Sequence, residues 1–319
     1  MSTQGSSESR AEKPPLALIA GPTASGKSDC AVRLALALTR RGHNPVVINA
    51  DSAQVYADLA VLSARPAAEE MRGVPHLLFG AWDGAEASSA ADWAARAREV
   101  VAKVHADGGV PILVGGTGLY LRTLLDGIAP VPAIDPDVRA VVRALPVTDA
   151  YDALQHEDPQ RAAALAPADA ARISRALEVI RSTGRSMIEW QHELAGGIGD
   201  AVTLHPAILL PPRAVLYPRC DARFAAMLAG GAIDEVRALL ARQLDPALPV
   251  MRAIGVAEIS AYLAGIATLA DTGTRGAQAT RNYAKRQYTW LRHQPPADWP
   301  RFEQNHYDIE VIFASLLRN

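Results

Sequence analysis

The sequence predicts an α/β fold, in which a parallel sheet flanked by helices is interrupted by a helical insertion. Apolar runs at residues 16–21, 46–48 and 111–114 alternate with stretches of helical spacing, a pattern typical of parallel strands joined by crossover helices. A fourth apolar run at 207–210 follows a long helical stretch, so the chain is expected to leave the sheet and return. Each of the first three strands ends in a polar or glycine-rich loop, and ligands bind at that edge of such sheets.

The helices and domain boundaries follow from spacing and from proline. Helical patterns fill the gaps between the first three strands, and three prolines close to residue 130 mark a change to an almost entirely helical stretch. The expected helices are 29–40, 90–107, 220–243, 253–264 and 273–293. The expected organisation is a disordered tail at 1–13, an α/β core of 14–134 and 205–319, and a helical insertion of 135–204.

Composition excludes several classes of protein. Of 319 residues, 49% are hydrophobic and 21% are charged, which excludes wholesale disorder. The apolar stretches are too short for a transmembrane helix, and the first thirteen residues lack the apolar centre of a signal peptide. Cys30 and Cys220 are the only cysteines, which excludes a disulfide framework and a four-cysteine zinc site. We therefore expect a cytoplasmic protein, and nothing in the sequence demands more than a monomer.

The charge pattern allows a local basic surface. The formal net charge is −2, which argues against a protein coated with positive charge. Only four of the 32 basic residues are lysines, so a lysine inside a motif is more informative than an arginine.

Residues 21–28 match the pattern GxxxxGK(S/T) between a strand and a helix. In that context the pattern predicts a P-loop, whose backbone N–H groups and helix N-terminus form a nest for an anion. Lys27 adds a point charge, and the Ser28 hydroxyl suits a Mg²⁺ ion. A glycine turn that merely caps a helix is the alternative. The motif thus predicts a P-loop NTPase-like sheet with a site for phosphate or pyrophosphate.

Two polar residues end the neighbouring strands. Asp51 follows the second strand and fits three roles: a cap or turn residue, a Mg²⁺ ligand, or a general base facing the phosphate site. Thr117 follows the third strand, where capping of the next helix is the favoured role. The same position would also place a hydroxyl beside the cleft. Spacing alone leaves the role of Asp51 open.

The segment 281–292 carries four basic residues, three aromatic residues and no acid. Helical spacing puts Arg281, Lys285, Tyr288 and Arg292 on one face, which suits a nucleic-acid backbone with an unstacked base. A solvated face is the ordinary interpretation of a charge run. The absence of acids and the presence of one of the four lysines weigh against it.

In the insertion, Asp169 is expected to cap a helix whose buried stripe includes Ile173 and Leu177. Arg172 and Arg175 lie off that stripe. Charge alone leaves a plain surface and an RNA contact equally open for both arginines.

Four motifs occur in one chain and in a fixed order: the P-loop, Asp51-Ser52, Gly115-Gly116-Thr117, and the helix Lys285-Arg286-Gln287-x-Thr289-Trp290-x-Arg292. Together they resemble the tRNA dimethylallyltransferases, also called tRNA isopentenyltransferases. The resemblance runs from about residue 16 to residue 293. Further matches lie at 74–76, 169–178, 183–184, 219–227 and 252–255.

That family transfers a dimethylallyl group from its diphosphate to the exocyclic amine of the adenine just 3′ of the anticodon. The resemblance implies tRNA and dimethylallyl diphosphate as partners and Mg²⁺ as cofactor. Lys27, Mg²⁺ on Ser28, and Arg219 or Arg223 would stabilise the departing diphosphate. Asp51 would accept a proton from the amine, and Thr117 would hydrogen-bond near the reacting centre. The implied diphosphate site is Gly21, Pro22, Thr23, Ala24, Ser25, Gly26, Lys27 and Ser28.

The resemblance also implies an RNA interface, because the target base must leave the anticodon-loop stack to react. The insertion would grip the anticodon stem-loop through Arg172 and Arg175, and Arg139 matches another contact position. The implied tRNA contacts are Asp51, Ser52, Ala53, Gln54, Thr117, Arg139, Arg172, Arg175, Arg252, Arg281, Lys285, Arg286, Tyr288 and Arg292.

Three other classes of protein compete with this one. A P-loop kinase for a small molecule leaves the basic helix and the insertion unexplained. A prenyltransferase acting on free adenine nucleotides needs no grip on a stem-loop. A non-catalytic RNA-binding protein has no need of Lys27, Ser28, Asp51 and Thr117 together.

The chain departs from the family pattern at three places. Arg65 stands where lysine is usual, Leu77 where a second histidine is usual, and Val256 where an aromatic residue is usual. A guanidinium is not an equivalent donor to an ammonium. These departures concern tRNA contacts and rate, and the reaction class stays the same.

Overall fold

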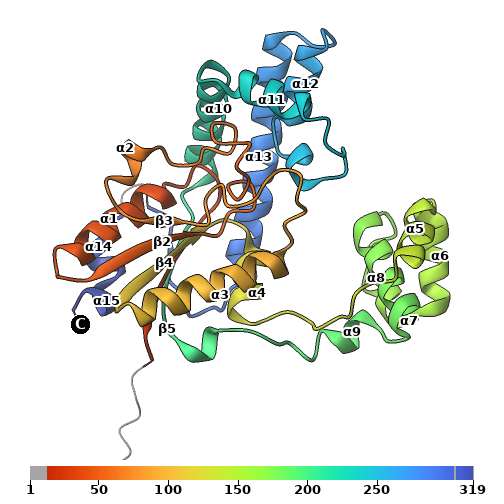
Figure 1. Ribbon diagram of the computed structural model, residues 1–319, viewed down its shortest axis with the longest axis horizontal. Coiled ribbons are helices and arrows are strands. Elements are labelled where there is room, and N and C mark those ends of the chain that lie inside the picture. Colours follow the sequence, from red (N-terminus) through yellow and green to blue (C-terminus); the bar gives the residue numbers. More distant parts are fainter. Residues whose placement is uncertain (1–12, 305–306, 319) are drawn as a thin grey trace, which may run out of the picture. The chain divides into compact units, whose positions relative to one another are not determined.

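The computed structural model describes residues 13–304 and 307–318, so the tail predicted at 1–13 lies, apart from Lys13, outside the described residues. The chain divides into two compact units (Figure 1): unit 1 is made of the residues up to 122 and from 199 onward, and unit 2 of 123–198. Both boundaries differ from the predicted 135–204. At the C-terminal side the reason is that residues 203 and 204 already pair with β1 in the sheet.

Unit 1 contains a six-stranded parallel sheet with the strand order β3-β2-β4-β1-β5-β6. The four predicted strands are present as β1 (Pro15–Ala20), β2 (Asn44–Asn49), β4 (Gly109–Gly115) and β5 (Thr203–Leu209). The edge strands β3 (His76–Leu77) and β6 (Arg301–Phe302) are missing from the prediction. Each of these strands has only two residues, which is too short to be recognised as an apolar run of strand length.

Helices cover both faces of the sheet. Alternate residues of a strand point to opposite faces, and Ala17 and Ile19 of β1 share a buried cluster with α1 (Lys27–Thr39). α14 (Ile309–Ile312) and α15 (Ala314–Leu317) join that cluster. The right-handed crossover rule puts α3 (Ala90–Ala106), which connects to β4, on the other face.

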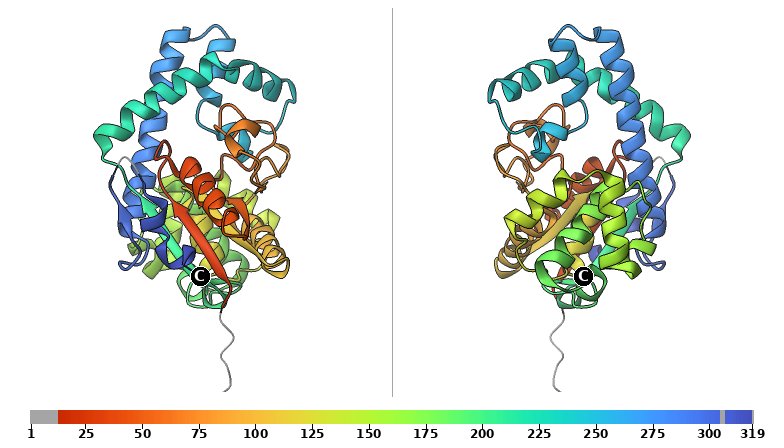
Figure 2. Two further views of the ribbon diagram at one scale, coloured as in Figure 1. Left: turned by 90° about the vertical axis from the view of Figure 1, so that its left-hand side faces the viewer. Right: turned by 90° about the vertical axis from the view of Figure 1, so that its right-hand side faces the viewer.

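The C-terminal helices of unit 1 gather above the sheet in Figures 1 and 2, and α13 extends from them along it. They are α10 (Arg213–Ala229), α11 (Ala232–Ala241), α12 (Val256–Leu263) and α13 (Leu269–His293). The single helix predicted at 220–243 is wrong, because the chain turns at Gly231, which has φ 109°. α13 begins earlier than the predicted residue 273, since the Thr268 side chain caps it by accepting from the Asp271 N–H at 3.1 Å.

The remaining elements of unit 1 are short. They are α2 (Ala68–Met71), α4 (Gly118–Leu125, whose last three residues belong to unit 2), η1 (Gly199–Ala201) and η2 (Pro249–Arg252). Within the described ranges, no helix is both long and apolar enough to cross a membrane.

Unit 2 is helical, as predicted, and has its own core. Val142, Leu154, Ile173 and Leu177 are fully buried in one cluster. Asp169 caps the longest helix, accepting from the Arg172 N–H at 3.2 Å as expected. The helices are α5 (Pro136–Ala144), α6 (Val147–Glu157), α7 (Pro159–Ala163), α8 (Ala170–Thr183) and α9 (Met187–Trp190).

The close packing of α13 on α10 depends on Gly276, because a Cβ atom there would overlap the ring of Phe224. We predict that Gly276→Ala lowers the free energy of unfolding by about 1–3 kcal/mol, despite the better helix propensity of alanine. Gly273→Ala is the matched control in the same helix, since its added Cβ would lie 3.8 Å from the Leu228 side chain. The control should gain up to about 1 kcal/mol. Urea unfolding checks both, and equal effects of the two changes would contradict the packing argument.

Candidate functional site

The predicted order of strand, loop and helix is confirmed: β1 ends at Ala20, and α1 begins at Lys27. The loop between them leaves backbone N–H groups available to a ligand. Gly26 precedes α1 with φ 87°, and no side chain caps the helix. The first N–H groups of α1 therefore point out of the helix end without a side-chain acceptor. The Lys27 side chain is buried, whereas Ser28 is exposed. This geometry suits an anion at the loop, with a hydroxyl on the open side.

Lys27 and Asp51 form a pair of opposite charges at this edge of the sheet. The Lys27 Nζ lies 3.9 Å from the Asp51 Oδ2, and the two side chains are 7% and 9% exposed. Burial lowers the pKa of Lys27, Asp51 opposes that shift, and the nearby Arg223 adds to it. An additional anion at the loop would stabilise the charged ammonium.

Asp51 is held by the residues that end β2. Its N–H donates to the Asn49 Oδ1 at 2.9 Å, and the Asn49 Nδ2 donates to the Asp51 carbonyl at 3.0 Å. The Asp51 Oδ1 accepts from the Ala53 N–H at 3.1 Å. One carboxylate oxygen thus makes the turn expected of an aspartate, while the other faces Lys27. The turn interpretation and a chemical role are therefore compatible.

Thr117, which follows β4, hydrogen-bonds to Ser52 in the loop after β2. The Thr117 Oγ1 accepts from the Ser52 N–H at 2.9 Å and donates to the Ser52 Oγ at 3.2 Å. The Tyr283 hydroxyl of α13 interacts with both side chains, while burial raises the pKa of Tyr283 to about 12. Thr117 therefore joins the ends of β2 and β4 to α13, where the sequence favoured a simple helix cap. Tyr283 was not predicted as a site residue.

Two cavities lie at this site and share the side chain of Arg223. The larger, of about 770 Å³, is lined by residues 24–29 of the P-loop, by 64–66, and by Arg219 and Arg223 among others. The smaller, of about 290 Å³, is lined by polar and apolar groups together: Thr23, Asp51, Ser52, Ala53, Tyr56, Leu59, Leu62, Ser63, Ser88, Tyr120, Arg223, Phe224, Met227, Pro249, Arg252, Ala253, Ile254, Thr280, Tyr283 and Arg286. Arg223 borders both, so it marks the junction between them.

Arg219 and Arg223 of α10 have different settings. Arg219 is exposed and borders only the larger cavity. The Arg223 Nη2 donates to the Ser63 carbonyl at 3.2 Å. Desolvation lowers the pKa of Arg223, and Asp51 opposes that shift. Both arginines named from the sequence can therefore face an anion at the P-loop, and Arg223 also faces the smaller cavity.

Gln287 of α13 is a site residue that the sequence analysis quoted without giving it a role. Its Oε1 accepts from the Thr23 N–H at 2.8 Å in a buried bond. A Cβ atom at Gly116 would overlap the Gln287 amide, so this glycine, the first residue after β4, makes room for the contact. The P-loop is thereby tied to a helix 264 residues further along the chain. Only the motif around Gln287 signalled it in advance.

The predicted basic face of α13 is only partly exposed. Tyr288 is buried and lies under the Arg213 guanidinium, which is 5.0 Å from its ring. The expected exposed aromatic residue at this position is therefore wrong, because packing against α10 turns it inward. Arg281 pairs with Asp221, and Arg292 lies 3.4 Å from Glu303. The acids absent from the segment itself are supplied by its neighbours.

Lys285 and Arg286 border a shallow groove of about 530 Å³ along α13, together with Asn282, Thr289, Trp290, His293 and Gln294. Arg286 also borders the smaller cavity. Of the predicted basic face, Lys285 borders this groove, while the exposed Arg292 lies outside it.

Gln54 has a structural role in unit 1. Its side chain is buried, and its Nε2 donates to the carbonyls of Ser63 at 3.1 Å and Ala64 at 2.8 Å. The amide expected to contact RNA is thus occupied inside the protein. Ser52, Ala53 and Arg252, named with it, border the smaller cavity.

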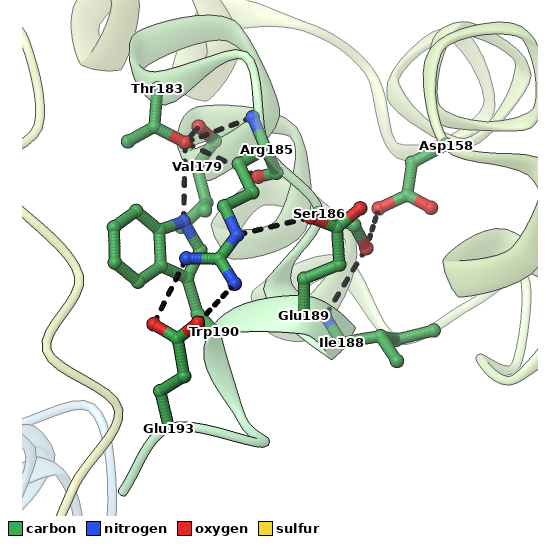
Figure 3. Close-up of polar contacts among 9 residues, drawn as sticks. All are labelled: Asp158, Val179, Thr183, Arg185, Ser186, Ile188, Glu189, Trp190 and Glu193. Atoms are coloured by element: carbon green, nitrogen blue, oxygen red, sulfur yellow. Dashed lines mark hydrogen bonds and ion pairs between the residues drawn. The ribbon is translucent and has the colours of Figure 1, made fainter. Parts of the chain in front are cut away.

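In unit 2, several arginines form ion pairs with nearby acidic side chains. Arg172 pairs with Asp169 at 3.0 Å and Arg181 with Glu157 at 2.7 Å. Figure 3 shows Arg185 held by Glu189 and Glu193, with the Trp190 ring beside it. These pairs offset most of the local positive charge.

A different arrangement surrounds Glu178, whose side chain is only 3% exposed. The Arg143 Nε donates to it at 2.9 Å, while Arg139 and Arg175 lie at 3.9 and 3.8 Å. Three guanidiniums share one carboxylate, so this cluster keeps a surplus of positive charge. Arg139 and Arg175 were named from the sequence, and Arg143 was not.

A sequence model of the family described as IPP transferase matches residues 54–294. A tRNA dimethylallyltransferase of Erythrobacter litoralis is 66% identical over 307 residues, which cover 96% of this chain and 97% of the relative. One from Novosphingobium aromaticivorans is 65% identical, with 87% of this chain and 99% of the relative covered.

Solved structures agree with the sequence relatives. The tRNA isopentenylpyrophosphate transferase of Bacillus halodurans has a TM-score of 0.66 and 32% identity, covering 96% of this chain and 95% of its own. A eukaryotic dimethylallyltransferase, described as acting on tRNA, has a TM-score of 0.74 and 28% identity. That match covers 87% of this chain and 70% of the eukaryotic one.

Removing the acceptor at Gln287 should loosen the P-loop. Gln287→Met leaves the buried Thr23 N–H without a partner, which costs about 1–3 kcal/mol. We predict that the affinity for inorganic pyrophosphate, measured by calorimetry, falls about tenfold. The reason is that the loop conformation that binds pyrophosphate becomes less stable without this bond. Gln278→Met, at an exposed position of the same helix, should leave the affinity unchanged. Unaltered binding by the Gln287 variant would show that this bond does not organise the loop.

Proposed function

The chain belongs to the IPP transferase family, and we propose that it transfers a dimethylallyl group from dimethylallyl diphosphate to tRNA. The acceptor is the exocyclic amine of the adenine 3′-adjacent to the anticodon, and diphosphate is released. One observation carries the proposal: Lys27 borders the larger cavity, Asp51 borders the smaller one, and the two side chains are 3.9 Å apart. An anion site and a carboxylate thus meet where donor and acceptor have to meet.

The donor diphosphate binds in the larger cavity. The N-terminal N–H groups of α1 and the Lys27 ammonium recognise phosphate whatever group is attached to it. Arg219 and Arg223 border the same cavity. As the bond from carbon to oxygen breaks, these groups stabilise the charge that develops on the leaving diphosphate.

Mg²⁺ fits this cavity as a partner of the diphosphate. The Ser28 side chain is an exposed oxygen ligand at its edge. Within residues 13–304 and 307–318, no group of three or more His, Cys, Asp or Glu side chains could hold a metal ion. Mg²⁺ is often held by substrate phosphates, waters and one or two protein ligands. When bound, it would supply positive charge to the diphosphate.

Asp51 is the general base. The adenine amine forms a bond to the first carbon of the dimethylallyl group, the bond from that carbon to the diphosphate oxygen breaks, and the electron pair leaves with diphosphate. The proton lost by the amine passes to the Asp51 carboxylate. The Ala53 N–H orients that carboxylate, and Asn49 holds the Asp51 backbone. The Thr117 hydroxyl hydrogen-bonds to the neighbouring Ser52.

Each unit has its own candidate surface for RNA: the groove at Lys285 and Arg286 in unit 1, and the cluster of Arg139, Arg143 and Arg175 in unit 2. Both carry cationic side chains that can neutralise phosphates. A kinase or an enzyme for free nucleotides needs neither surface. A tRNA substrate agrees with the cytoplasmic location expected from the sequence, and we propose that the protein acts there as a monomer.

Replacement of the base tests the chemistry. We predict that Asp51→Asn binds donor and RNA but loses at least about 100-fold in turnover, because an amide accepts no proton. The measurement is the mass of an anticodon stem-loop incubated with enzyme, Mg²⁺ and dimethylallyl diphosphate, where transfer adds one C₅H₈ unit. A product on free AMP but none on RNA would favour the enzyme for free nucleotides. Full turnover by the variant would remove Asp51 from the base role.

The groove on α13 gives a separate test. We predict that Lys285→Ala weakens RNA binding and lowers the slope of log affinity against log salt by about 0.7–0.9, the equivalent of one phosphate contact. Lys103→Ala is the control, since Lys103 is an exposed lysine of α3 that lies 3.9 Å from Asp107. A slope that is the same in both variants and in the wild type would exclude the groove from the interface.

A further inference from the structure

The segment after β2 forms a wall between the two cavities. Leu59, Leu62 and Ser63 border the smaller cavity, while residues 64–66 border the larger one. Within this segment, residues 60–65 make a tight turn, in which the Arg65 N–H donates to the Ala60 carbonyl at 2.9 Å. We refer to residues 60–65 as the dividing turn. Its conformation sets the shape of both cavities.

The dividing turn contains backbone strain. Ala64 has φ 48°, in the left-handed region that residues other than glycine rarely adopt. Such a conformation persists only where the surrounding contacts determine it. The contacts that hold the turn are therefore as important as its own residues.

Glu235 of α11 supplies those contacts. Its Oε1 accepts from the Ala60 N–H at 2.6 Å and from the Val61 N–H at 2.8 Å. Its Oε2 accepts from the Leu62 N–H at 2.9 Å. A single carboxylate thus takes three successive backbone donors, and each bond is strengthened by its charge. This residue lies 173 positions or more from the amides that it binds.

The other end of the dividing turn determines where Arg223 lies. The Ser63 carbonyl accepts from the Arg223 Nη2 at 3.2 Å. Gln54 donates to the same carbonyl and to that of Ala64. Glu235 holds the start of the turn, and the turn presents the oxygen that aims the guanidinium at the junction of the cavities.

We propose that Glu235 is a positioning residue for the transfer reaction, acting through the dividing turn on Arg223. The inference rests on the proposed function, because Arg223 serves the diphosphate there. Glu235 itself touches neither cavity. Its effect reaches the ligand through the Ser63 carbonyl and the guanidinium.

The same helix offers a matched control. Arg242, at the C-terminal end of α11, pairs with Asp58 and lies 2.6 Å from Asp83. It anchors the same segment of chain upstream of the dividing turn, and it makes no bond to the three amides. A purely structural anchor should behave like Arg242.

A double-mutant cycle tests the inference, with inorganic pyrophosphate affinity by calorimetry and kcat/KM as its two readouts. Glu235→Gln keeps an oxygen acceptor but loses the charge, and we expect about a tenfold loss in both readouts. Combined with Arg223→Lys, the losses should not add, because both changes disturb one guanidinium. Arg242→Gln should lower stability yet combine additively with Arg223→Lys. Glu235→Leu, with no acceptor, should lose more than Glu235→Gln.

The outcomes separate two kinds of failure. Additive losses of Glu235→Gln and Arg223→Lys, in protein that binds pyrophosphate, would overturn the positioning role alone. Wild-type protein that binds no pyrophosphate would overturn the proposed donor site and this inference with it. Thermal unfolding of each variant, measured first, sets a temperature at which all are folded. Should Glu235→Leu fail to fold, the cycle with Glu235→Gln still decides.

Discussion

The site depends on holding two opposite charges, Lys27 and Asp51, away from water at one edge of the sheet. Both side chains are less than a tenth exposed, and a buried charge without a partner costs several kcal/mol. β4 lies between β1, which leads to the loop before Lys27, and β2, which precedes Asp51. Gly115 ends β4 where any Cβ atom would overlap the backbone of Ala50. The absence of a side chain there lets the end of β4 lie against the backbone of Ala50, next to Asp51.

α13 makes a single unit of the parts around that pair. Gly276 lets α10 approach, and with it the Phe224 ring that borders the smaller cavity. Gln287 holds the Thr23 N–H, and Tyr283 interacts with Thr117 and Ser52. The outward side carries the basic groove. One helix therefore positions the P-loop, the smaller cavity and the surface proposed for RNA. It brings together parts that lie far apart in the sequence.

Whether a basic side chain adds positive charge to the surface depends on its acidic partners more than on the number of basic residues. In the arginine-rich sequence Arg172 and Arg175 look equivalent. In the structure Arg172 forms an ion pair with Asp169. Arg175 shares the buried Glu178 with Arg139 and Arg143. The carboxylate keeps three like charges together at a position where they would otherwise repel one another. On α13, likewise, the charge of Arg281 is paired with Asp221, whereas Lys285 borders the open groove.

The sequence by itself determined four of the six strands, the P-loop and the positions of Asp51 and Thr117 at the strand ends, because these depend on local patterns and on the common edge of parallel strands. The tertiary structure decided which faces are open. Tyr288 turns inward because α10 covers that side of α13. Gln287 and Glu235 find backbone partners far away in the chain. Helical spacing shows which residues share a face, and only packing shows what that face meets.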